Sequence, residues 1–342
     1  MTSRLARTIA SVPLLVLALG CAGAAPGSAE SPGSGSAADG AGASNANAEY
    51  PQYAIPGTST RLRLPDGFTR PARDARLVHE ELGIVASLIE LHVSSSEANE
   101  TLEGVRAGMQ EKLEVESESS VERASGATGF VVRGRREDHF ASAAALTLEG
   151  IVAVVLLIHS PSSADAVAAI LASMEIDPSA KFDPLAAHGL ALGEMAGLEP
   201  VYKTLAPMMF FEQGVEVPVP PDAAVMSIAV IPVPEVRHPD DRMAGAALAG
   251  VLKAFSPDLE HVESSELQVD GTEATEVVTR GTDNGQPIAV YGAALSDPYA
   301  LLTFFGKVGA QRHDRYIPRF RKLVESLRRS KPPLEAVQPA GR

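Results

Sequence analysis

The chain has 342 residues, enough for about two domains of ordinary size, and 45% of its residues are apolar. Aromatic residues make up only 5% and tryptophan is absent, which argues against a sugar-binding cleft or a base-stacking surface, since both depend on aromatic faces. The formal net charge of -14 argues against nucleic acid as a partner, because an acidic body repels polyphosphate.

The N-terminus carries the pattern of a secretion signal. Arg4 and Arg7 form a short basic segment, and an apolar run from Ile9 to Leu19 follows them. This run is too short to span a bilayer but is typical of the core of a signal peptide. We therefore expect residues 1–20 to be removed on secretion.

The apolar run ends in Ala18-Leu19-Gly20-Cys21, which resembles the lipobox of bacterial lipoproteins, with alanine where leucine is usual. Cys21 is the only cysteine, so no disulfide and no cysteine-based metal site can form. The resemblance implies that Cys21 carries acyl chains such as palmitate, which together hold a protein firmly to a membrane. Ala22 follows the cysteine, and by analogy with lipoprotein sorting this favours the outer membrane, facing the periplasm.

Residues 21–50 read as a flexible tether. Glycine, serine and alanine supply most of this segment, and it shows no hydrophobic period that could stabilise an ordered structure. A coil of this length has a root-mean-square reach of about 30 Å. The tether is therefore expected to hold a folded body away from the lipid head groups.

The rest of the chain contains two segments with similar sequence patterns, Gly126–Gly134 and Gly271–Gly281. Each is followed by two more strand-like runs, with hairpin turns expected at Gly150 and at Asp297-Pro298. These runs are Phe140–Leu148, Ile151–Ile158, Ile288–Leu295 and Tyr299–Phe305. An apolar strand also comes before each set, at Ile84–Val93 and Val225–Val233. The repeated order indicates a duplication.

Amphipathic helices recur at matching places in the two sets. Apolar residues at helical spacing predict helices over 98–113 and 239–255, and a further helix after the last strand of each set. Pro161 and Pro318 are expected near the starts of the two closing helices. Gly245 and Gly250 lie inside a predicted helix, where we expect close packing against a neighbouring element.

The segment Thr60–Phe68, with the phrase Leu64-Pro65-Asp66-Gly67-Phe68, resembles the start of PsbP-like domains. The resemblance and the repeated order together predict an α+β fold with two similar α/β/α-type sandwich domains and mostly antiparallel sheets. The expected domains span 51–178 and 182–330, and a tail follows over 331–342. PsbP-like proteins are mostly binding or assembly modules, so the resemblance implies a non-catalytic role.

Two groups of residues are candidate contact sites. The run Met208-Met209-Phe210-Phe211 is either a strand buried against a helix or a patch for an apolar ligand, and the strand is favoured. Basic residues gather near the C-terminus of an otherwise acidic chain and are candidates for contact with a partner or an anionic surface. They are Arg312, Arg315, Arg319, Arg321, Lys322, Arg328 and Arg329.

No pattern for catalysis or metal binding emerges from the eight histidines, which do not pair at ligand spacing on one helix face. His92 and His159 end apolar strands and are expected to be satisfied within the fold. We predict a non-catalytic envelope lipoprotein that binds a protein partner and needs no cofactor or metal. The alternative is a carrier or sensor of a small apolar or lipid ligand, and an envelope hydrolase comes third.

Overall fold

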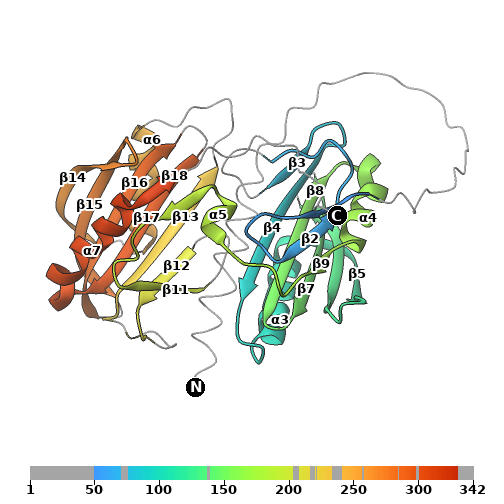
Figure 1. Cartoon of the computed structure of the whole chain (residues 1–342), viewed down its shortest axis with the longest axis horizontal. Helices are drawn as coiled ribbons and strands as arrows, with labels where there is room; N and C mark the ends of the chain where they lie inside the picture. The colour runs from blue at the N-terminus through green and yellow to red at the C-terminus, as the bar shows by residue number, and fades with distance from the viewer. Residues whose placement is uncertain are drawn as a thin grey trace, which may run out of the picture.

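The computed structural model describes residues 50–70, 76–136, 139–202, 208–215, 220, 222–232, 241–255, 258–283, 285–297 and 300–329. These residues form two sheet-rich bodies of the α+β class (Figure 1). All strand pairs described in them are antiparallel. The predicted fold class is therefore confirmed. Cys21, the tether up to residue 49 and the tail over 331–342 lie outside the described residues.

The first body is built on a six-stranded sheet of order β3-β4-β8-β7-β6-β5. Its central strands β7 and β8 are almost continuous runs of alanine, valine, leucine and isoleucine, because helices or strands cover both of their faces. The bounds are β3 Leu77–His79, β4 Ile84–His92, β5 Glu114–Glu122, β6 Thr128–Arg136, β7 His139–Leu148 and β8 Ile151–His159.

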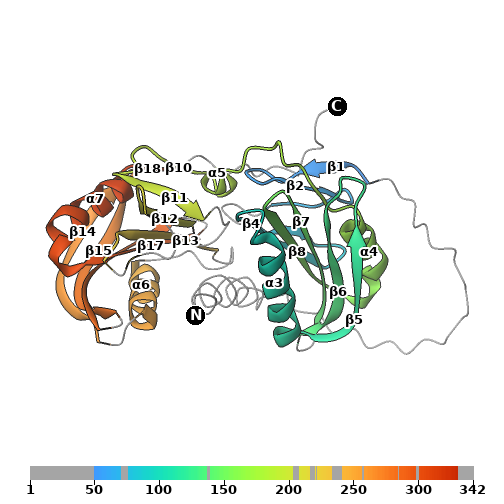
Figure 2. The same cartoon turned by 90° about the horizontal axis from the view of Figure 1, so that it is seen from below.

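Two apolar cores lie on opposite faces of this sheet (Figure 2). Helix α3 (Ala98–Lys112) buries Leu102 and Met109 on one face. Helix α4 (Ala164–Ala172), preceded by the 3-10 turn η1 (Pro161–Ser163), buries Ile170 and Leu171 on the other. A small sheet of order β1-β2-β9 joins the α4 face, with bounds β1 Gln52–Ala54, β2 Thr60–Arg63 and β9 Glu175–Ile176.

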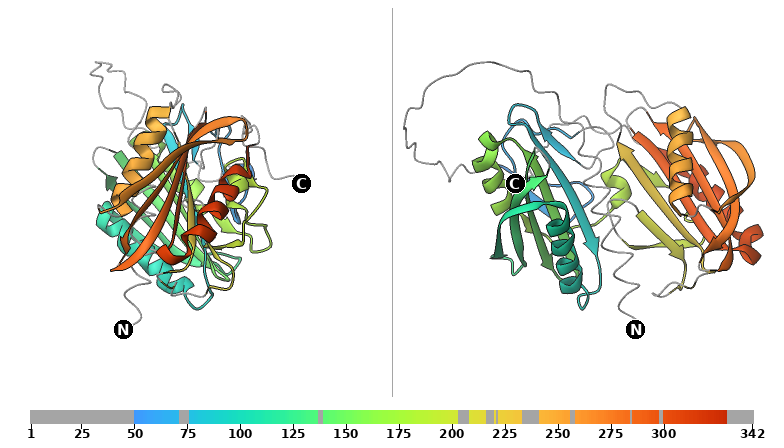
Figure 3. Two further views of the ribbon diagram at one scale, coloured as in Figure 1. Left: turned by 90° about the vertical axis from the view of Figure 1, so that its left-hand side faces the viewer. Right: turned by 180° about the vertical axis from the view of Figure 1, so that it is seen from behind.

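The second body has a seven-stranded sheet of order β11-β12-β13-β17-β16-β15-β14. Helices α6 (Asp241–Phe255) and α7 (His313–Glu325) lie on opposite sides of it (Figure 3, left), and η2 (Ala310–Arg312) leads into α7. A short pair, β10 and β18, joins the α7 side. The strand bounds are β10 Leu190–Leu192, β11 Leu198–Tyr202, β12 Met208–Glu212, β13 Val225–Pro232, β14 Glu260–Val269, β15 Thr272–Asp283, β16 Gln286–Asp297, β17 Ala300–Gly309 and β18 Leu327–Arg329.

The two bodies follow one order of elements. In the first, β4 pairs with β8 and the sheet continues through β7, β6 and β5; in the second, β13 pairs with β17 and the sheet continues through β16, β15 and β14. The two edge strands also share a β-bulge. In each strand one residue has no partner on the neighbouring strand: Glu116 in β5 and Val262 in β14. In both strands the bulge comes two residues after a glutamate that lies opposite an arginine. These pairs are Glu114 and Arg135 in the first body, and Glu260 and Arg280 in the second.

The short helix α5 (Pro184–Ala187) connects the two bodies. Ala187 belongs to a core cluster of the first body, and Leu185 packs against the main core of the second. A side chain on Gly57 would come within 2.4 Å of the Asp183 carbonyl oxygen, so only glycine lets the chain before β2 approach α5 this closely.

Two details differ from the sequence-based expectations. Helix α7 begins at His313, so Pro318 lies inside the helix rather than near its start, and the carbonyl of Asp314 loses its usual helical donor. A Cβ atom added to Gly245 or Gly250 would meet nothing within 4 Å, so the predicted close packing there is wrong. Among the residues with a described structure, no helix combines the length and apolar character that crossing a bilayer requires.

Candidate functional site

The basic residues near the C-terminus surround an amphipathic helix. Tyr316, Phe320, Leu323 and Val324 turn the apolar face of α7 into the core of the second body. Helical residues three or four positions apart share a face, so the arginines and the lysine of α7 lie at positions beside this buried face or away from it. This spacing places the basic residues of α7 around the rim of the buried face.

Three guanidinium groups gather on one aromatic ring. The central carbon of the guanidinium lies 4.8 Å from the centre of the Tyr316 ring for Arg312, 5.2 Å for Arg315 and 5.1 Å for Arg319. Such contacts are cation–π interactions, each worth about 0.5–1 kcal/mol at an exposed site. The ring itself is fully buried, so the arginine side chains form its outer cover. We call Arg312, Arg315, Arg319 and Tyr316 the arginine surface.

Glu212, the last residue of β12, is the carboxylate that balances part of this charge. Arg312 Nη2 donates a hydrogen bond to Glu212 Oε1 at 2.6 Å, and the Tyr316 hydroxyl donates to the same oxygen. Burial by itself raises the pKa of Glu212, but hydrogen bonds from Arg312 and Tyr316 outweigh it and hold the pKa below its ordinary value. Glu212 is thus ionised at neutral pH, and it is paired with Arg312.

Arg315 and Arg319 have no carboxylate of their own among the described residues. Arg315 is exposed, whereas Arg319 is half-buried and its Nη1 atom lies close to Gly197. A Cβ atom at Gly197 would come within 3.0 Å of that nitrogen. Three positive charges therefore share one ion-paired carboxylate, which leaves the arginine surface with excess positive charge.

Arg321 points into the sheet rather than outward. Its Nε atom lies 3.0 and 2.9 Å from the two carboxylate oxygens of Glu276, a buried residue of β15. Burial alone raises the pKa of Glu276, but hydrogen bonds from Arg321 outweigh this effect and lower the pKa. The fully buried ring of Tyr291 lies beside this pair. Burial is the main cause that raises the pKa of the Tyr291 phenol, and the negative charge of Glu276 raises it further. Arg321 is thus a structural residue.

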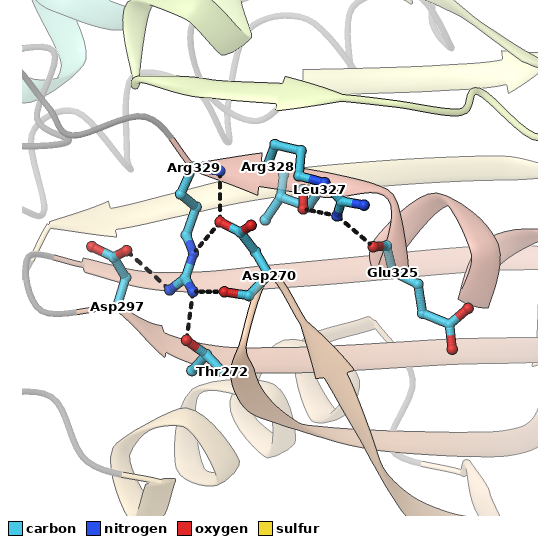
Figure 4. Close-up of polar contacts among 7 residues, drawn as sticks. All are labelled: Asp270, Thr272, Asp297, Glu325, Leu327, Arg328 and Arg329. Carbon is cyan, nitrogen blue, oxygen red and sulfur yellow. Dashed lines mark hydrogen bonds and ion pairs between the residues drawn. The ribbon is translucent and has the colours of Figure 1, made fainter.

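Arg329 is also held within the fold (Figure 4). Its Nε atom lies 3.3 Å from a carboxylate oxygen of Asp270, and its Nη1 atom lies 3.3 Å from one of Asp297. Nη2 donates to the Asp270 carbonyl oxygen at 2.9 Å and to the Thr272 hydroxyl. The pKa of Asp270 is lowered, above all because its carboxylate accepts a hydrogen bond from the backbone N–H of Arg329. Hydrogen bonds from the Arg329 side chain lower it further, and together they outweigh the effect of burial, which raises it. These contacts fix β18 against the hairpin that joins β14 and β15.

Arg328 and Lys322 complete the predicted set. The Arg328 side chain is exposed and donates from Nη1 to the carbonyl oxygens of Glu325 and Leu327, at 3.1 and 2.8 Å (Figure 4). Lys322 is exposed on α7. Within the described part of the chain, neither residue forms an ion pair. The predicted basic group is therefore divided, with Arg312, Arg321 and Arg329 paired inside the fold and the other four available to an external anion.

The run from Met208 to Phe211 forms most of β12, paired with β11 and β13. Met208 and Phe210 are buried in the main core of the second body, Phe211 is also buried, and Met209 is half-buried. Buried side chains present no surface to a ligand. Of the two alternatives for this run, the structure therefore shows the buried strand. A contact with an apolar ligand at this run stays a prediction.

Two histidines of the first body contact buried polar groups. His159 Nε2 lies 3.1 Å from the Ser142 hydroxyl, and Nδ1 lies 2.8 Å from the Ser160 carbonyl oxygen. Burial lowers the pKa of His159, which keeps the imidazole neutral. Glu90 and His92 form the second contact, with 2.8 Å between Glu90 Oε1 and His92 Nε2. Among the described residues, no group of three or more histidine, aspartate and glutamate side chains is placed to hold a metal ion.

Sequence reasoning missed the residues that organise the basic group. Tyr316 follows Arg312 by four positions and precedes Arg319 by three, so helical spacing alone would have placed both arginines beside its ring. The acids Glu212, Glu276 and Asp270 come from strands or turns far away in the sequence. Only the pairing of the strands brings them to the arginines.

The chain is similar to several solved structures at low identity, whereas no protein-family model and no curated protein matches it. LpqN of Mycobacterium tuberculosis, described as involved in cell envelope biogenesis, is 11% identical with a TM-score of 0.32, over 40% of this chain and 81% of LpqN. Cyanobacterial PsbP from Synechocystis is 12% identical with a TM-score of 0.26, over 41% of this chain and 91% of PsbP. The T6SS immunity protein TplEi of Pseudomonas aeruginosa is 12% identical with a TM-score of 0.31, over 83% and 99% of the two chains.

Proposed function

We propose that this protein is a non-catalytic lipoprotein of the cell envelope that binds an acidic segment of a partner protein through its arginine surface. The observation that carries the proposal is the gathering of three guanidinium groups on Tyr316 with one ion-paired carboxylate. Like charges placed this close repel one another, and a bound carboxylate relieves the repulsion. The whole chain is acidic, with a formal net charge of -14, so a positively charged surface differs from the rest of the molecule.

The chemistry of arginine favours a carboxylate-bearing partner. A guanidinium presents planar, paired donors that match the two oxygens of a carboxylate, and such charge-assisted bonds are stronger than neutral ones. Tyr316 holds the groups of Arg315 and Arg319 in place, so less side-chain freedom is lost when the partner binds. Lys322, in the last turn of α7, and Arg328, in β18, add further exposed positive charge after the arginine surface in the chain.

The proposed location in the cell envelope is inferred from the N-terminal sequence. Lipidation of Cys21 and a tether over residues 21–50 would keep both bodies at the membrane surface, in our proposal the outer membrane facing the periplasm. The intact mass and membrane partitioning of the wild type and of Cys21→Ala test this part. Acyl mass and membrane sedimentation of the wild type alone support it, and a soluble, unacylated wild type overturns it.

A charge-reversal pair tests the binding surface. Arg315→Glu with Arg319→Glu is compared with Arg133→Glu and Lys181→Glu, exposed cations of the first body that change the net charge equally. Each full-length variant is crosslinked in envelope membranes and recovered through an affinity tag. We expect the wild type and the control to recover the same partner, and the arginine-surface variant to lose it. Equal recovery by both variants, or no reproducible partner for the wild type, would contradict the proposal.

A further inference from the structure

The outer edge of the second body presents a long strand with one neighbour. β14 is the last strand of the seven-stranded sheet, and within the described residues it pairs with β15 alone. It lies along the outer rim of the body in Figure 1. A strand in this position directs every second N–H and C=O group away from the sheet, and these groups can pair with a further strand. Ten residues make β14 a long edge strand.

Natural proteins protect edge strands with charged side chains, lysine above all, with proline, with bulges or with a covering segment. β14 contains neither proline nor lysine, and its one irregularity is the bulge at Val262, near its start. The regular part from Glu263 to Val269 is therefore open to a partner strand. Val262 is itself 46% exposed, which is unusual for a large apolar side chain in this protein.

The first body supplies an internal comparison, because β5 occupies the same edge and has the same bulge. There the bulged residue is Glu116, which forms an ion pair with Arg135 at 3.1 Å, and Glu118 pairs with Arg106 at 3.1 Å. In β14, by contrast, Glu260, Glu263 and Glu266 are exposed and form no ion pair with any described residue. Ion pairs partly neutralise the edge of the first body, whereas at the edge of the second body no ion pair with a described residue is present and Glu263 interacts with Arg321 only at longer range.

We propose that β14 accepts an extended, lysine- or arginine-rich segment of a partner protein as an eighth strand of this sheet. The free backbone groups of the edge provide the binding, as in other cases of strand addition. The unpaired glutamates select a basic segment and disfavour a second copy of this chain, since two acidic edges repel. Glu263 lies on the same face of the sheet as buried Leu267, and Glu266 lies on the opposite face, so both faces of the added strand meet an acid.

The test uses a synthetic peptide with the repeat Lys-Lys-Val-Val, which places lysine on both faces of a strand. Hydrogen exchange of the full chain in detergent is measured segment by segment, with and without the peptide. We expect exchange in residues 260–269 to slow by about tenfold or more when the peptide binds, and exchange in residues 114–122 to stay unchanged. Equal protection of both edges would overturn the proposal, and so would an absence of protection in β14.

Two controls separate strand addition from simple charge attraction. A peptide with the repeat Lys-Lys-Pro-Pro has the same charge but cannot donate backbone hydrogen bonds at its prolines, so it should not protect β14. The variant with Glu260→Lys, Glu263→Lys and Glu266→Lys should lose the protection, whereas Glu114→Lys with Glu122→Lys in β5 should keep it. Protection by the proline peptide, or protection that survives the triple reversal, would contradict the inference. The arginine surface takes no part in this experiment, so its result is independent of the proposed function.

Discussion

Arg321 and Glu276 join the last helix to the sheet of the second body through an ion pair whose carboxylate is almost fully buried. The Glu276 side chain is 1% exposed and that of Arg321 is 36% exposed. Ser265 also donates to Glu276, at 2.9 Å. A buried pair of this kind adds little net stability compared with an apolar pair, but the loss of one partner leaves a buried group uncompensated.

Glu276→Gln should therefore destabilise the second body. The neutral amide removes the negative charge that compensates the guanidinium of Arg321. We therefore expect the free energy that opens the second body to fall by about 3 kcal/mol. Native-state hydrogen exchange of β15 and β16 measures this body separately from the first. The matched control is Glu116→Gln, which breaks the half-exposed pair with Arg135 and should cost less than about 1 kcal/mol. Similar losses for the two variants would show that the Glu276 pair has no special role.

The same pair should make stability depend on pH. The folded-state pKa of Glu276 lies below its unfolded value, which is about 4.3 for glutamate. The contribution of the ionised carboxylate is therefore present above about pH 4.3 and is lost as pH falls through the folded-state value. Urea titrations of the wild type and Glu276→Gln, followed by circular dichroism, should show a stability difference that is full at neutral pH and narrows in acid. A difference that stays constant down to about pH 2.5 would contradict this account.

Arg329 should control whether β18 stays attached. Arg329→Ala removes the contacts to Asp270, Asp297 and Thr272, so we expect faster hydrogen exchange in β18 and in its partner β10. Arg329→Lys should give an intermediate result, since lysine keeps the charge but cannot reach several acceptors at once. Arg328→Ala is the matched control, because this neighbouring exposed side chain contacts only nearby carbonyl oxygens. Equal acceleration by Arg328→Ala and Arg329→Ala would rule out the specific role of Arg329.

The strands with the strongest apolar runs could be predicted from the sequence almost to the residue. Ile151–Ile158 was expected, and β8 spans Ile151–His159. These runs are informative because a strand buried on both faces must be apolar throughout. The edge strands β5 and β14 carry glutamate and serine instead, and such a pattern is typical of a loop. Pairing with a neighbouring strand stabilises them, and a single sequence does not contain that information.

The basic group shows a similar limit. Its location at the C-terminal helix could be read from composition, but the separate roles of its members could not. Arg319 and Arg321 are two positions apart, so they point to different sides of α7, one to the ring of Tyr316 and the other to Glu276. Which side is buried depends on how α7 packs on the sheet, and the acids that meet it come from distant strands.

Helix α6 should gain stability from the loss of two glycines. Gly245 and Gly250 have open space where a Cβ atom would lie, and neither has a positive φ angle. Alanine at each position should therefore stabilise the helix by about 0.5–1 kcal/mol, through its better helix propensity. The increase in melting temperature of the double variant, measured by circular dichroism, checks this. Gly129→Ala is the contrasting variant, because its Cβ atom would lie 1.9 Å from the Ala145 carbonyl oxygen.

Glu90 should be the most sensitive acidic residue of the first body. Its side chain is fully buried, and both of its oxygens accept the Ser59 N–H at 2.9 Å. The Thr60 hydroxyl donates to it at 2.8 Å, and His92 lies at 2.8 Å. This carboxylate thus fixes the start of β2 against β4, because it accepts from groups on both segments.

Glu90→Gln keeps the shape of the side chain but replaces one acceptor oxygen with an NH₂ donor. That donor must face another donor, so we expect a loss of about 2–3 kcal/mol in the opening free energy of the first body. Hydrogen exchange of β2 and β4 measures the loss, and the exchange of β15 and β16 should not change. Glu118→Gln on the exposed edge of the same sheet is the control and should cost less than about 1 kcal/mol. If Glu90→Gln is as mild as Glu118→Gln, the carboxylate does not fix the two strands, and the packing of Leu62 and Leu88 in the neighbouring core must hold them instead.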